Sequence, residues 1–326
     1  MDFTTTYMGL GLRTPIIAGS SGLTKSIGLI KRMADSGAGA VILKSLFEEQ
    51  LVQDPKALSE QDEMYFRYPE VFEYLDKFPV EDGVEAYLNL IQEAKEAVNI
   101  PVIASINCIS ATEWTSFARE ITKAGADGLE LNIAIYPFNK NVDSQTIEDT
   151  YIKILKGVKE NTGIPVSVKI GNNFTNIYRI TNRLDEAGAD ALVLFNRFSR
   201  PDIDIQTLKP VSGSTMSSPQ EITESLKWIS ILSPELKCSL AGATGIHNAG
   251  GIIKQLLAGA DAVQVTSTLY QHGIEYIGKM IDDLVAWMKK FGYSSIGDFK
   301  NLMVRNEDAA ALERVEFMKK TVGEVE

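Results

Sequence analysis

The sequence predicts an α/β fold, a (β/α)8 or TIM barrel formed by a single domain over residues 1–326. Four segments share one layout, in which an amphipathic stretch of helical length leads through a glycine and small residues into an apolar run. They are SGAGAVIL (36–43), AGADGLEL (124–131), AGADALVL (187–194) and AGADAVQV (258–265). Glycine suits the left-handed end of a helix, and nearly continuous apolar runs are typical of parallel strands covered on both faces. No Gly/Ser/Pro-rich linker divides the chain.

Taken in order along the chain, eight strands are expected, with helical patterns between them. In NIPVIAS (99–105) and GIPVSVK (163–169) a proline stands at the entry of a short apolar strand. The expected strands are residues 15–18, 40–43, 101–105, 128–132, 165–169, 190–195, 236–241 and 262–266. Strand–helix alternation at this count favours a barrel over two doubly wound domains.

Two connections are longer than the others and follow strands, which places them at the carboxyl face where barrel active sites lie. Residues 45–82 are rich in aromatic side chains and are expected to pack over the barrel mouth, whereas 196–218 are rich in polar and turn residues. One or two additional helices are expected from about residue 294.

Composition excludes several classes of function. The net charge of −11 argues against nucleic acid or anionic membranes as partners, and no run is apolar enough to span a bilayer. The two cysteines, Cys108 and Cys238, have no metal-ligand spacing, so no metal site is predicted. Free thiols and the lack of a signal-peptide pattern predict a cytoplasmic location.

Polar residues collect where the expected strands end. They are Lys44 and Ser45, Ser105 and Asn107, Asn132, Lys169, Asn196, and Thr266 to Thr268. Lysines at a barrel mouth are costly unless an anion meets them, so this ring is interpreted as a binding site. Glu130 faces the same way as Asn132 but deeper, and it is expected to pair with a lysine inside the barrel.

The last two strands add a phosphate signal. SLAGATGIHNAGG (239–251) ends a strand in small residues and opens a helix, and Thr266-Ser267-Thr268 ends the next strand. Barrels commonly bind a phosphate after strands seven and eight. Asn248 is expected to cap the helix, and His247 is taken as a turn residue.

These residues resemble the soluble, class 1 dihydroorotate dehydrogenases, in order, from about Pro15 to Asp298. The motifs are TPIIAGSSGLT, AVILKS (40–45), LELN, VSVK, Asn196, AGATGI, QVTSTL and SSIGDF. The resemblance implies an FMN-dependent oxidoreductase of pyrimidine biosynthesis that oxidises a CH–CH bond, dihydroorotate to orotate or a related planar carboxylated substrate. It also implies a homodimer and a separate electron acceptor. No GxGxxG fingerprint for a dinucleotide follows a strand in this sequence, so an NAD site within this chain is not expected.

The resemblance also assigns site residues. The cofactor would be held by Ala18, Gly19, Ser20, Lys44, Ser45, Asn132, Lys169, Ser217, Ser218, Gly242, Gly245, Thr266 and Ser267. Within this set, the phosphate would be bound by Ser217, Ser218, Gly242, Gly245, Thr266 and Ser267. Lys169 would lie near the flavin N1 and O2. Substrate would contact Lys44, Asn132 and Asn196.

The match fails at the catalytic base. The family's N-L-S-C-P-N segment reads Asn132-Ile133-Ala134-Ile135-Tyr136-Pro137-Phe138-Asn139 here, so Ile135 or Tyr136 takes the place of the cysteine. Tyr136, Cys108 or no protein base at all are left open as alternatives, with Lys44 as a further catalytic candidate. The usual pKa of tyrosine, near 10, makes it a poor base unless cations lower it.

A second departure is that residues 45–82 lack the family's N-x-M-G-L-P-N segment, while Arg197 and Arg200 are available to bind a carboxylate. Other hypotheses are therefore kept. One is a flavoprotein with a different substrate, another is a flavoprotein without turnover that serves a redox partner, and the last is a flavin-free phosphate-binding barrel.

Overall fold

The computed structural model describes residues 1–47, 80–108, 114–135, 139–198, 201–304, 314–315 and 318–319, with only the backbone described at 80–82, 108, 114–116 and 212. Eight parallel strands close into a barrel, in which the last strand pairs with the first. In barrel order they are β3 (Ile16–Ala18), β4 (Ala40–Ile42), β6 (Val102–Cys108), β7 (Gly128–Ile133), β8 (Val166–Ile170), β9 (Ala191–Leu194), β12 (Ser239–Gly242) and β13 (Ala262–Val265). The predicted (β/α)8 barrel and its eight strands are confirmed.

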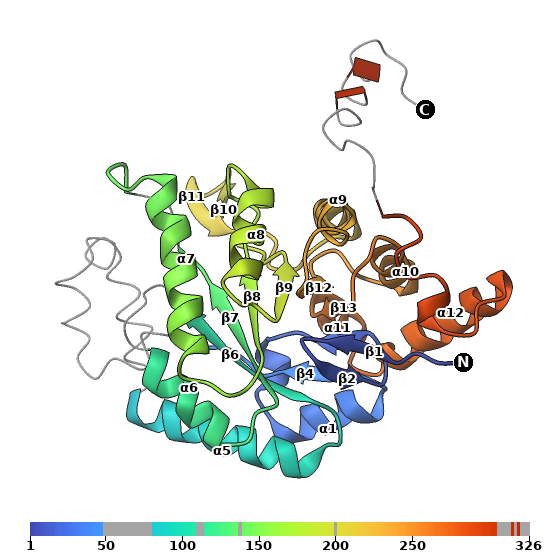
Figure 1. The fold of residues 1–326 in the computed structure, drawn as a ribbon, viewed down its shortest axis with the longest axis horizontal. Helices are drawn as coiled ribbons and strands as arrows, with labels where there is room; N and C mark the ends of the chain where they lie inside the picture. The colour runs from blue at the N-terminus through green and yellow to red at the C-terminus, as the bar shows by residue number, and fades with distance from the viewer. Residues whose placement is uncertain are drawn as a thin grey trace.

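Helices surround the strands, and one follows each strand of the barrel (Figure 1). They are α1 (Ile27–Asp35), α5 (Val80–Ala97), α6 (Trp114–Lys123), α7 (Ser144–Lys159), α8 (Ile177–Glu186), α9 (Ile222–Leu232), α10 (Ala249–Leu257) and α12 (Tyr276–Phe291). Shorter helices are η1 (Gly22–Thr24), η3 (Pro219–Glu221), α11 (Ser267–His272) and η4 (Ile296–Asp298). Within the described ranges, no helix is long and apolar enough to cross a bilayer.

Two apolar clusters fill the fold. The larger lies between the strands and the helices, and the smaller fills the barrel interior with residues such as Ile17, Ile42, Ile103 and Val193. The period of two along each strand separates the two sets. Because Glu130 and Lys169 share the inward parity, the same rule directs their side chains into the barrel.

The repeated AGAD layout has a structural role. Asp127, Asp190 and Asp261 each stand just before a strand and accept a hydrogen bond from the backbone N–H at the entry of the preceding strand, at 2.7 Å in every case. Each carboxylate also binds a lysine, respectively Lys95, Lys159 and Lys300. In the first unit Gly39 takes this position, because a Cβ there would come within 1.9 Å of the Thr14 carbonyl oxygen.

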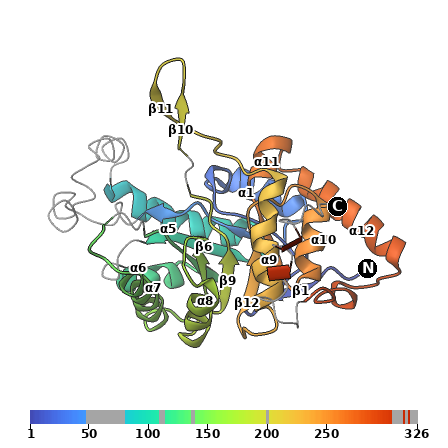
Figure 2. The same ribbon diagram turned by 90° about the horizontal axis from the view of Figure 1, so that it is seen from above.

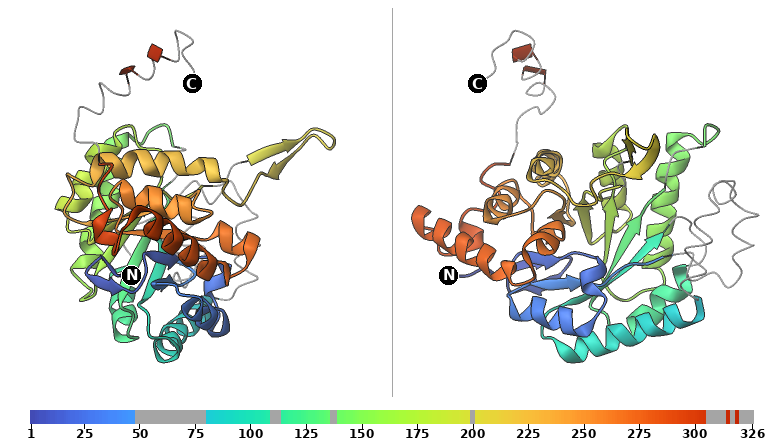
Figure 3. Two further views of the ribbon diagram at one scale, coloured as in Figure 1. Left: turned by 90° about the vertical axis from the view of Figure 1, so that its right-hand side faces the viewer. Right: turned by 180° about the vertical axis from the view of Figure 1, so that it is seen from behind.

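Two antiparallel hairpins lie outside the barrel sheet. The first joins β1 (Thr5–Tyr7) to β2 (Leu10–Leu12), and the hydrogen bond from Met8 N to Ser239 Oγ places it at the amino ends of the strands. The second joins β10 (Pro201–Asp204) to β11 (Lys209–Ser212) within the long connection after β9, and it projects away from the body (Figures 2 and 3). The remaining strand, β5 (Leu46–Phe47), extends the edge beside β6.

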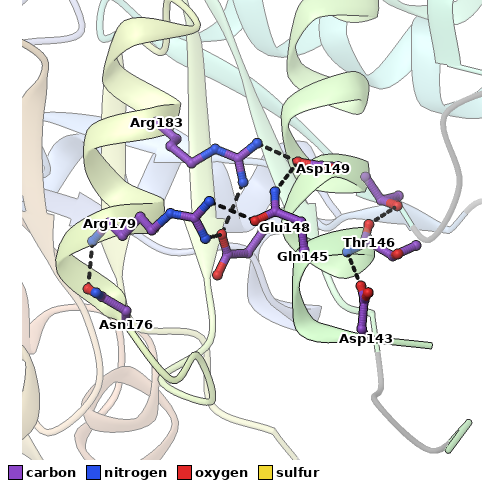
Figure 4. Close-up of polar contacts among 9 residues, drawn as sticks. Asp143, Gln145, Thr146, Glu148, Asp149, Asn176, Arg179 and Arg183 are labelled. Atoms are coloured by element: carbon purple, nitrogen blue, oxygen red, sulfur yellow. Dashed lines mark hydrogen bonds and ion pairs between the residues drawn. The ribbon is translucent and has the colours of Figure 1, made fainter. Parts of the chain in front are cut away.

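Helices α7 and α8 are joined by a cluster of charged side chains on the outside of the barrel (Figure 4). Glu148 is 4% exposed, and one of its carboxylate oxygens binds Arg179 at 2.8 Å and Arg183 at 3.0 Å. Arg183 also binds Asp149 at 2.5 Å. The cluster therefore holds two neighbouring helices through one buried carboxylate.

Candidate active site at the carboxyl ends of the strands

A cavity of about 160 Å³ opens at the carboxyl ends of β8, β9, β12 and β13. The lining contains eight of the residues that the sequence singled out: Ser20, Lys169, Asn196, Arg197, Ser217, Gly245, Thr266 and Ser267. These residues come from five different segments of the chain, and the barrel closure brings them together. Four members of the polar ring expected from the strand ends, Lys169, Asn196, Thr266 and Ser267, therefore line one cavity.

Asn132 and Asn196 form a direct pair beside this cavity. The side-chain N–H of Asn196 donates to Asn132 Oδ1 over 2.8 Å, and the backbone N–H of Arg197 donates to Asn196 Oδ1 over 2.9 Å. Asn196 is fixed in turn by its own N–H, which donates to the carbonyl of Ile170. Both amides are thus oriented before any ligand binds, which lowers the entropic cost of recognition.

Lys169 is held at the cavity by a bridge to the buried Glu130. Its ammonium donates to Gln264 Oε1 over 2.9 Å, and Gln264 Nε2 donates to Glu130 Oε2 over 2.5 Å. The lysine Nζ lies 3.8 Å from Glu130 Oε1, and the two side chains are 13% and 0% exposed. The predicted pairing of Glu130 with a lysine is confirmed. Sequence reasoning missed Gln264, although its inward parity in AVQV marks it.

Three serine hydroxyls form a hydrogen-bonded chain, with Ser20 after β3, Ser45 after β4 and Ser105 in β6. Ser20 Oγ lies 3.0 Å from Ser45 Oγ, which lies 2.8 Å from Ser105 Oγ. Tyr87 fixes the end of the chain, because its hydroxyl donates to the Ser105 carbonyl and accepts from the Ser105 N–H. Burial raises the pKa of Tyr87, so its hydroxyl keeps its proton.

Lys44 does not join this chain, since its side chain is exposed. It lines a second cavity of about 680 Å³, together with Lys25 and Ser26 before α1, Ser45 after β4, and residues of α5. Ser20 lines the first cavity and Ser45 the second, so one pair of hydroxyls separates the two. The two predicted lysines therefore belong to adjoining spaces.

Three of the residues predicted to bind phosphate, Ser217, Gly245 and Ser267, form one hydrogen-bonded group. Ser217 N donates to Ser267 Oγ over 3.0 Å, and Gly245 N donates to Ser217 Oγ over 3.3 Å. His247 lies in the connection between β12 and α10, as expected of a turn residue, but it is only 7% exposed and its ring contacts this group. Its Nε2 lies 3.1 Å from Ser217 Oγ, and its Nδ1 lies 3.2 Å from Gln271 Oε1. Its two partners are distant in sequence, so no local signal identifies it.

Glycine is required at two positions of the site. Gly245 has φ +80, and a Cβ there would lie 2.2 Å from the backbone N of Ile222. A Cβ on Gly19 would lie 2.6 Å from Thr266 Oγ1, while Gly19 N donates to the Val265 carbonyl. The backbone at the end of β3, with the buried Ala18 and Gly19 after it, therefore packs against the end of β13, and Gly242 completes β12 next to the cavity.

Other predicted residues have structural partners. Asn248 caps α10 by accepting from Gly251 N, as expected. Arg197 is paired with Glu221 at 2.9 Å and donates to the Ser214 carbonyl, so its guanidinium is engaged within the protein. Ser218 is the N-cap residue of η3.

Several predicted features lie outside the described residues. They are Tyr136, Arg200, the side chain of Cys108 and residues 48–79 of the long first connection. Ile135 is described, and it packs against the main apolar cluster. The extra helices expected from residue 294 stay a prediction, because the described residues there form η4 and helical turns at 314–315 and 318–319.

The arrangement fits a cofactor with a phosphate at one end and an electron-accepting ring at the other. The lining of the first cavity combines the hydroxyls of Ser217, Thr266 and Ser267 and the backbone of Gly245 with the Lys169 ammonium. Small-molecule sites typically measure roughly 300–1,000 Å³, so a ligand of this length would use the first cavity and the adjoining one. At Gly19 and Gly245 the backbone packs closely against Thr266 and Ile222, which fixes the loops that line the cavity.

Comparisons with known proteins agree with this geometry. A family described as dihydroorotate dehydrogenase matches residues 3–288. Among curated relatives, the dihydroorotate dehydrogenase B (NAD(+)) catalytic subunit of Thermoplasma volcanium is 27% identical over 317 residues, 93% of this chain and 99% of the relative. The proteins of the same description from Methanocella arvoryzae and Methanosarcina mazei are 32% identical (83% and 88% of the two chains) and 30% identical (89% and 92%).

Proposed function

The chain belongs to the dihydroorotate dehydrogenase family, and from this premise we propose that it oxidises dihydroorotate or a closely related planar, carboxylated CH–CH donor. It is an FMN-dependent oxidoreductase of this family. The observation that carries the proposal is the Asn132–Asn196 amide pair beside the Lys169 ammonium. Two oriented amides can recognise the edge of a planar ring, and the cation supplies charge where electrons arrive.

FMN, when bound, supplies the acceptor for a hydride. Ser217, Thr266 and Ser267, with the N–H of Gly245, would hold its phosphate. The backbone of Ala18, Gly19 and Ser20 would pass along the ring, and Lys169 would face the ring edge. Ser218 and Gly242 would support the phosphate end through their neighbours Ser217 and Ala243. These assignments rest on the cavity lining and on the close approach of Gly19 to Thr266.

The remaining residues would act on substrate. Lys44 and Ser45 line the adjoining cavity and would bind the carboxylate, with Asn132 and Asn196 on the ring. For the base the alternatives stay Tyr136, Cys108 or no protein base, because Ile135 packs against the apolar cluster and cannot accept a proton. A substrate other than dihydroorotate is the second candidate, favoured by the same replacement of the family's cysteine.

The electron acceptor is proposed to be a separate protein. The curated relatives are catalytic subunits of NAD(+)-linked enzymes by name, and this sequence holds no dinucleotide fingerprint. A neighbouring redox subunit would therefore take electrons from this chain and pass them to NAD. A purified chain that reduces NAD unaided at the rate of the complex would contradict this assignment.

We further propose that the chain forms a homodimer and is cytoplasmic. The β10–β11 hairpin supports the homodimer, since it projects from the body with Ile203, Ile205 and Leu208 at 65%, 78% and 82% exposure (Figure 3). Exposed apolar groups of this kind are typical of contact surfaces. The free thiol of Cys238 supports a reducing compartment. Light scattering of the wild type and of Leu208→Ser tests the dimer.

The central experiment is anaerobic titration of the yellow, purified protein with dihydroorotate, followed by its visible spectrum. Bleaching of the flavin absorbance within minutes is the expected result. A flavin that dithionite reduces but dihydroorotate leaves oxidised would reject this substrate, and related carboxylated compounds would be tested in the same way. A colourless protein that does not take up FMN would reject the cofactor assignment.

A further inference from the structure

Glu130 and Lys169 form an ion pair whose charged atoms lie 3.8 Å apart, too far for a direct hydrogen bond. Glu130 Oε1 is buried and has no hydrogen-bond partner among the described residues, although the Lys169 ammonium is only 3.8 Å away. A buried carboxylate normally gains most by direct contact with its counter-charge. The gap therefore requires a structural cause.

Gln264 supplies that cause. Its carbonyl oxygen accepts from the ammonium at 2.9 Å, and its amide N–H donates to the other carboxylate oxygen at 2.5 Å. The amide is 4% exposed and comes from β13, opposite β7 and β8, which carry the two charges. With both ends bound, the amide cannot rotate, and it holds the ammonium at the cavity instead of against the carboxylate.

We propose that Glu130 and Gln264 are positioning residues that set how much of the Lys169 positive charge acts on bound FMN. This inference rests on the proposed function, in which Lys169 faces the ring. Glu130 is the counter-charge that weakens the effect of the ammonium, and Gln264 is the spacer that prevents complete neutralisation. Together they adjust the reduction potential of the cofactor without touching it.

The two residues should act with opposite signs. A cation beside the ring favours the reduced cofactor, which carries more negative charge. Removing the carboxylate with Glu130→Gln leaves the ammonium uncompensated, so the potential rises. Removing the spacer with Gln264→Leu lets the ammonium move onto the carboxylate, so the potential falls. A role in packing alone would not produce opposite shifts.

The test is the midpoint potential of the FMN-loaded variants, measured by equilibration with a reference dye. We expect the ratio of the affinities for reduced and oxidised FMN to rise about tenfold in Glu130→Gln and to fall about tenfold in Gln264→Leu. For a two-electron couple, each change corresponds to about 30 mV. Ser167→Ala is the matched control, since Ser167 lies beside Glu130 in the β7–β8 register and its buried hydroxyl is neutral.

A double variant tests the coupling. In the Glu130→Gln background, Gln264→Leu should change the potential much less, because no carboxylate remains to attract the ammonium. Equal shifts in both backgrounds, or shifts of the two single variants in the same direction, would overturn the proposal. If one single variant fails to fold, an unchanged reduction potential in the other would also overturn the proposal.

The proposed function is tested separately by Lys169→Met. A protein that binds FMN with an unaltered potential in this variant would show that Lys169 does not face the ring, which contradicts the function assigned to it. A lowered potential in Lys169→Met, with no response to either Glu130→Gln or Gln264→Leu, would support that function and reject only the tuning role.

Discussion

Asn196 donates a hydrogen bond to Asn132 across the barrel mouth, over 2.8 Å, although 64 positions separate the two residues in sequence. One amide ends β7 and the other follows β9, and β8 with Lys169 lies between these strands. The pair and the lysine therefore form one polar edge. Because each amide orients the other, the site presents a fixed pattern of hydrogen-bonding groups to a planar ring.

This geometry predicts that Asn132→Ala and Asn196→Ala each lower kcat/KM for the substrate about 100-fold. Each variant loses one oriented, buried hydrogen-bonding group near the reacting atoms. The double variant should lose little more than either single variant, because the groups act as a unit. Stopped-flow reduction of the flavin gives the measurement. Asn182→Ala, on the outer surface of α8, is the control, and equal losses in all three would point to general instability instead.

The phosphate end yields a second prediction, on FMN affinity. His247→Ala removes the group that fixes Ser217, so the Kd for FMN should rise about fivefold, as expected for a lost hydrogen bond of about 1 kcal/mol. Quenching of FMN fluorescence by the apoprotein measures this. His272→Ala is a matched control, because His272 is exposed and its ring contacts that of Tyr276 in a tilted arrangement. An affinity that does not change in His247→Ala would remove His247 from the phosphate group.

Local patterns were sufficient to predict the barrel and its polar ring. Strand periodicity places Glu130, Asn132 and Lys169 on the inner face, and closure of eight strands then brings their ends together. The depth of Glu130 relative to Asn132 follows from the same rule. None of these predictions requires knowledge of contacts between residues far apart in the sequence, so the sequence alone is sufficient for them.

The missed features depend on partners far along the chain. Gln264 is significant because Lys169 and Glu130 lie on the opposite wall, and His247 is significant because Ser217 and Gln271 flank it. Arg197 is neutralised by Glu221, which its own neighbours do not indicate. The β10–β11 hairpin was missed for another reason, since its polar composition resembles that of an irregular loop.

A third prediction concerns stability. Glu148→Ala leaves two guanidinium groups without their shared carboxylate. We expect the free energy of unfolding to fall by about 2 kcal/mol. This loss is smaller than the usual cost of breaking a buried ion pair, because the arginines are partly exposed. Urea denaturation measures the change. Glu275→Ala, which breaks the exposed pair with Arg32, should have no measurable effect. If the two variants lose the same amount, burial does not strengthen the α7–α8 cluster.

Thiol reactivity gives a fourth prediction. Burial, and then the charge of Asp185, raise the pKa of the Cys238 thiol, so little thiolate forms at pH 8. Cys238 should therefore react with a thiol reagent far more slowly in the native protein than in urea. Cys238→Ser should leave any rapid labelling phase of the native protein unchanged. A rapid phase that disappears in this variant would show that the thiol is accessible.

Acid stability gives the final prediction. Backbone N–H groups of Ser295 and Ser294 lower the pKa of Asp298 below 3.8, and the N–H of Thr146 at the start of α7 does the same for Asp143. Because the pKa is lowered in the folded state, the carboxylate stabilises the protein fully at pH values above its pKa in the unfolded chain. This contribution is lost as the pH falls from 3.8 through the lowered pKa. Unfolding free energies measured between pH 7 and pH 3 should decline most steeply below about pH 4. Replacing both residues with asparagine should flatten that decline, because asparagine can still cap a helix but does not titrate. An unchanged slope in the double variant would assign the acid sensitivity to other carboxylates.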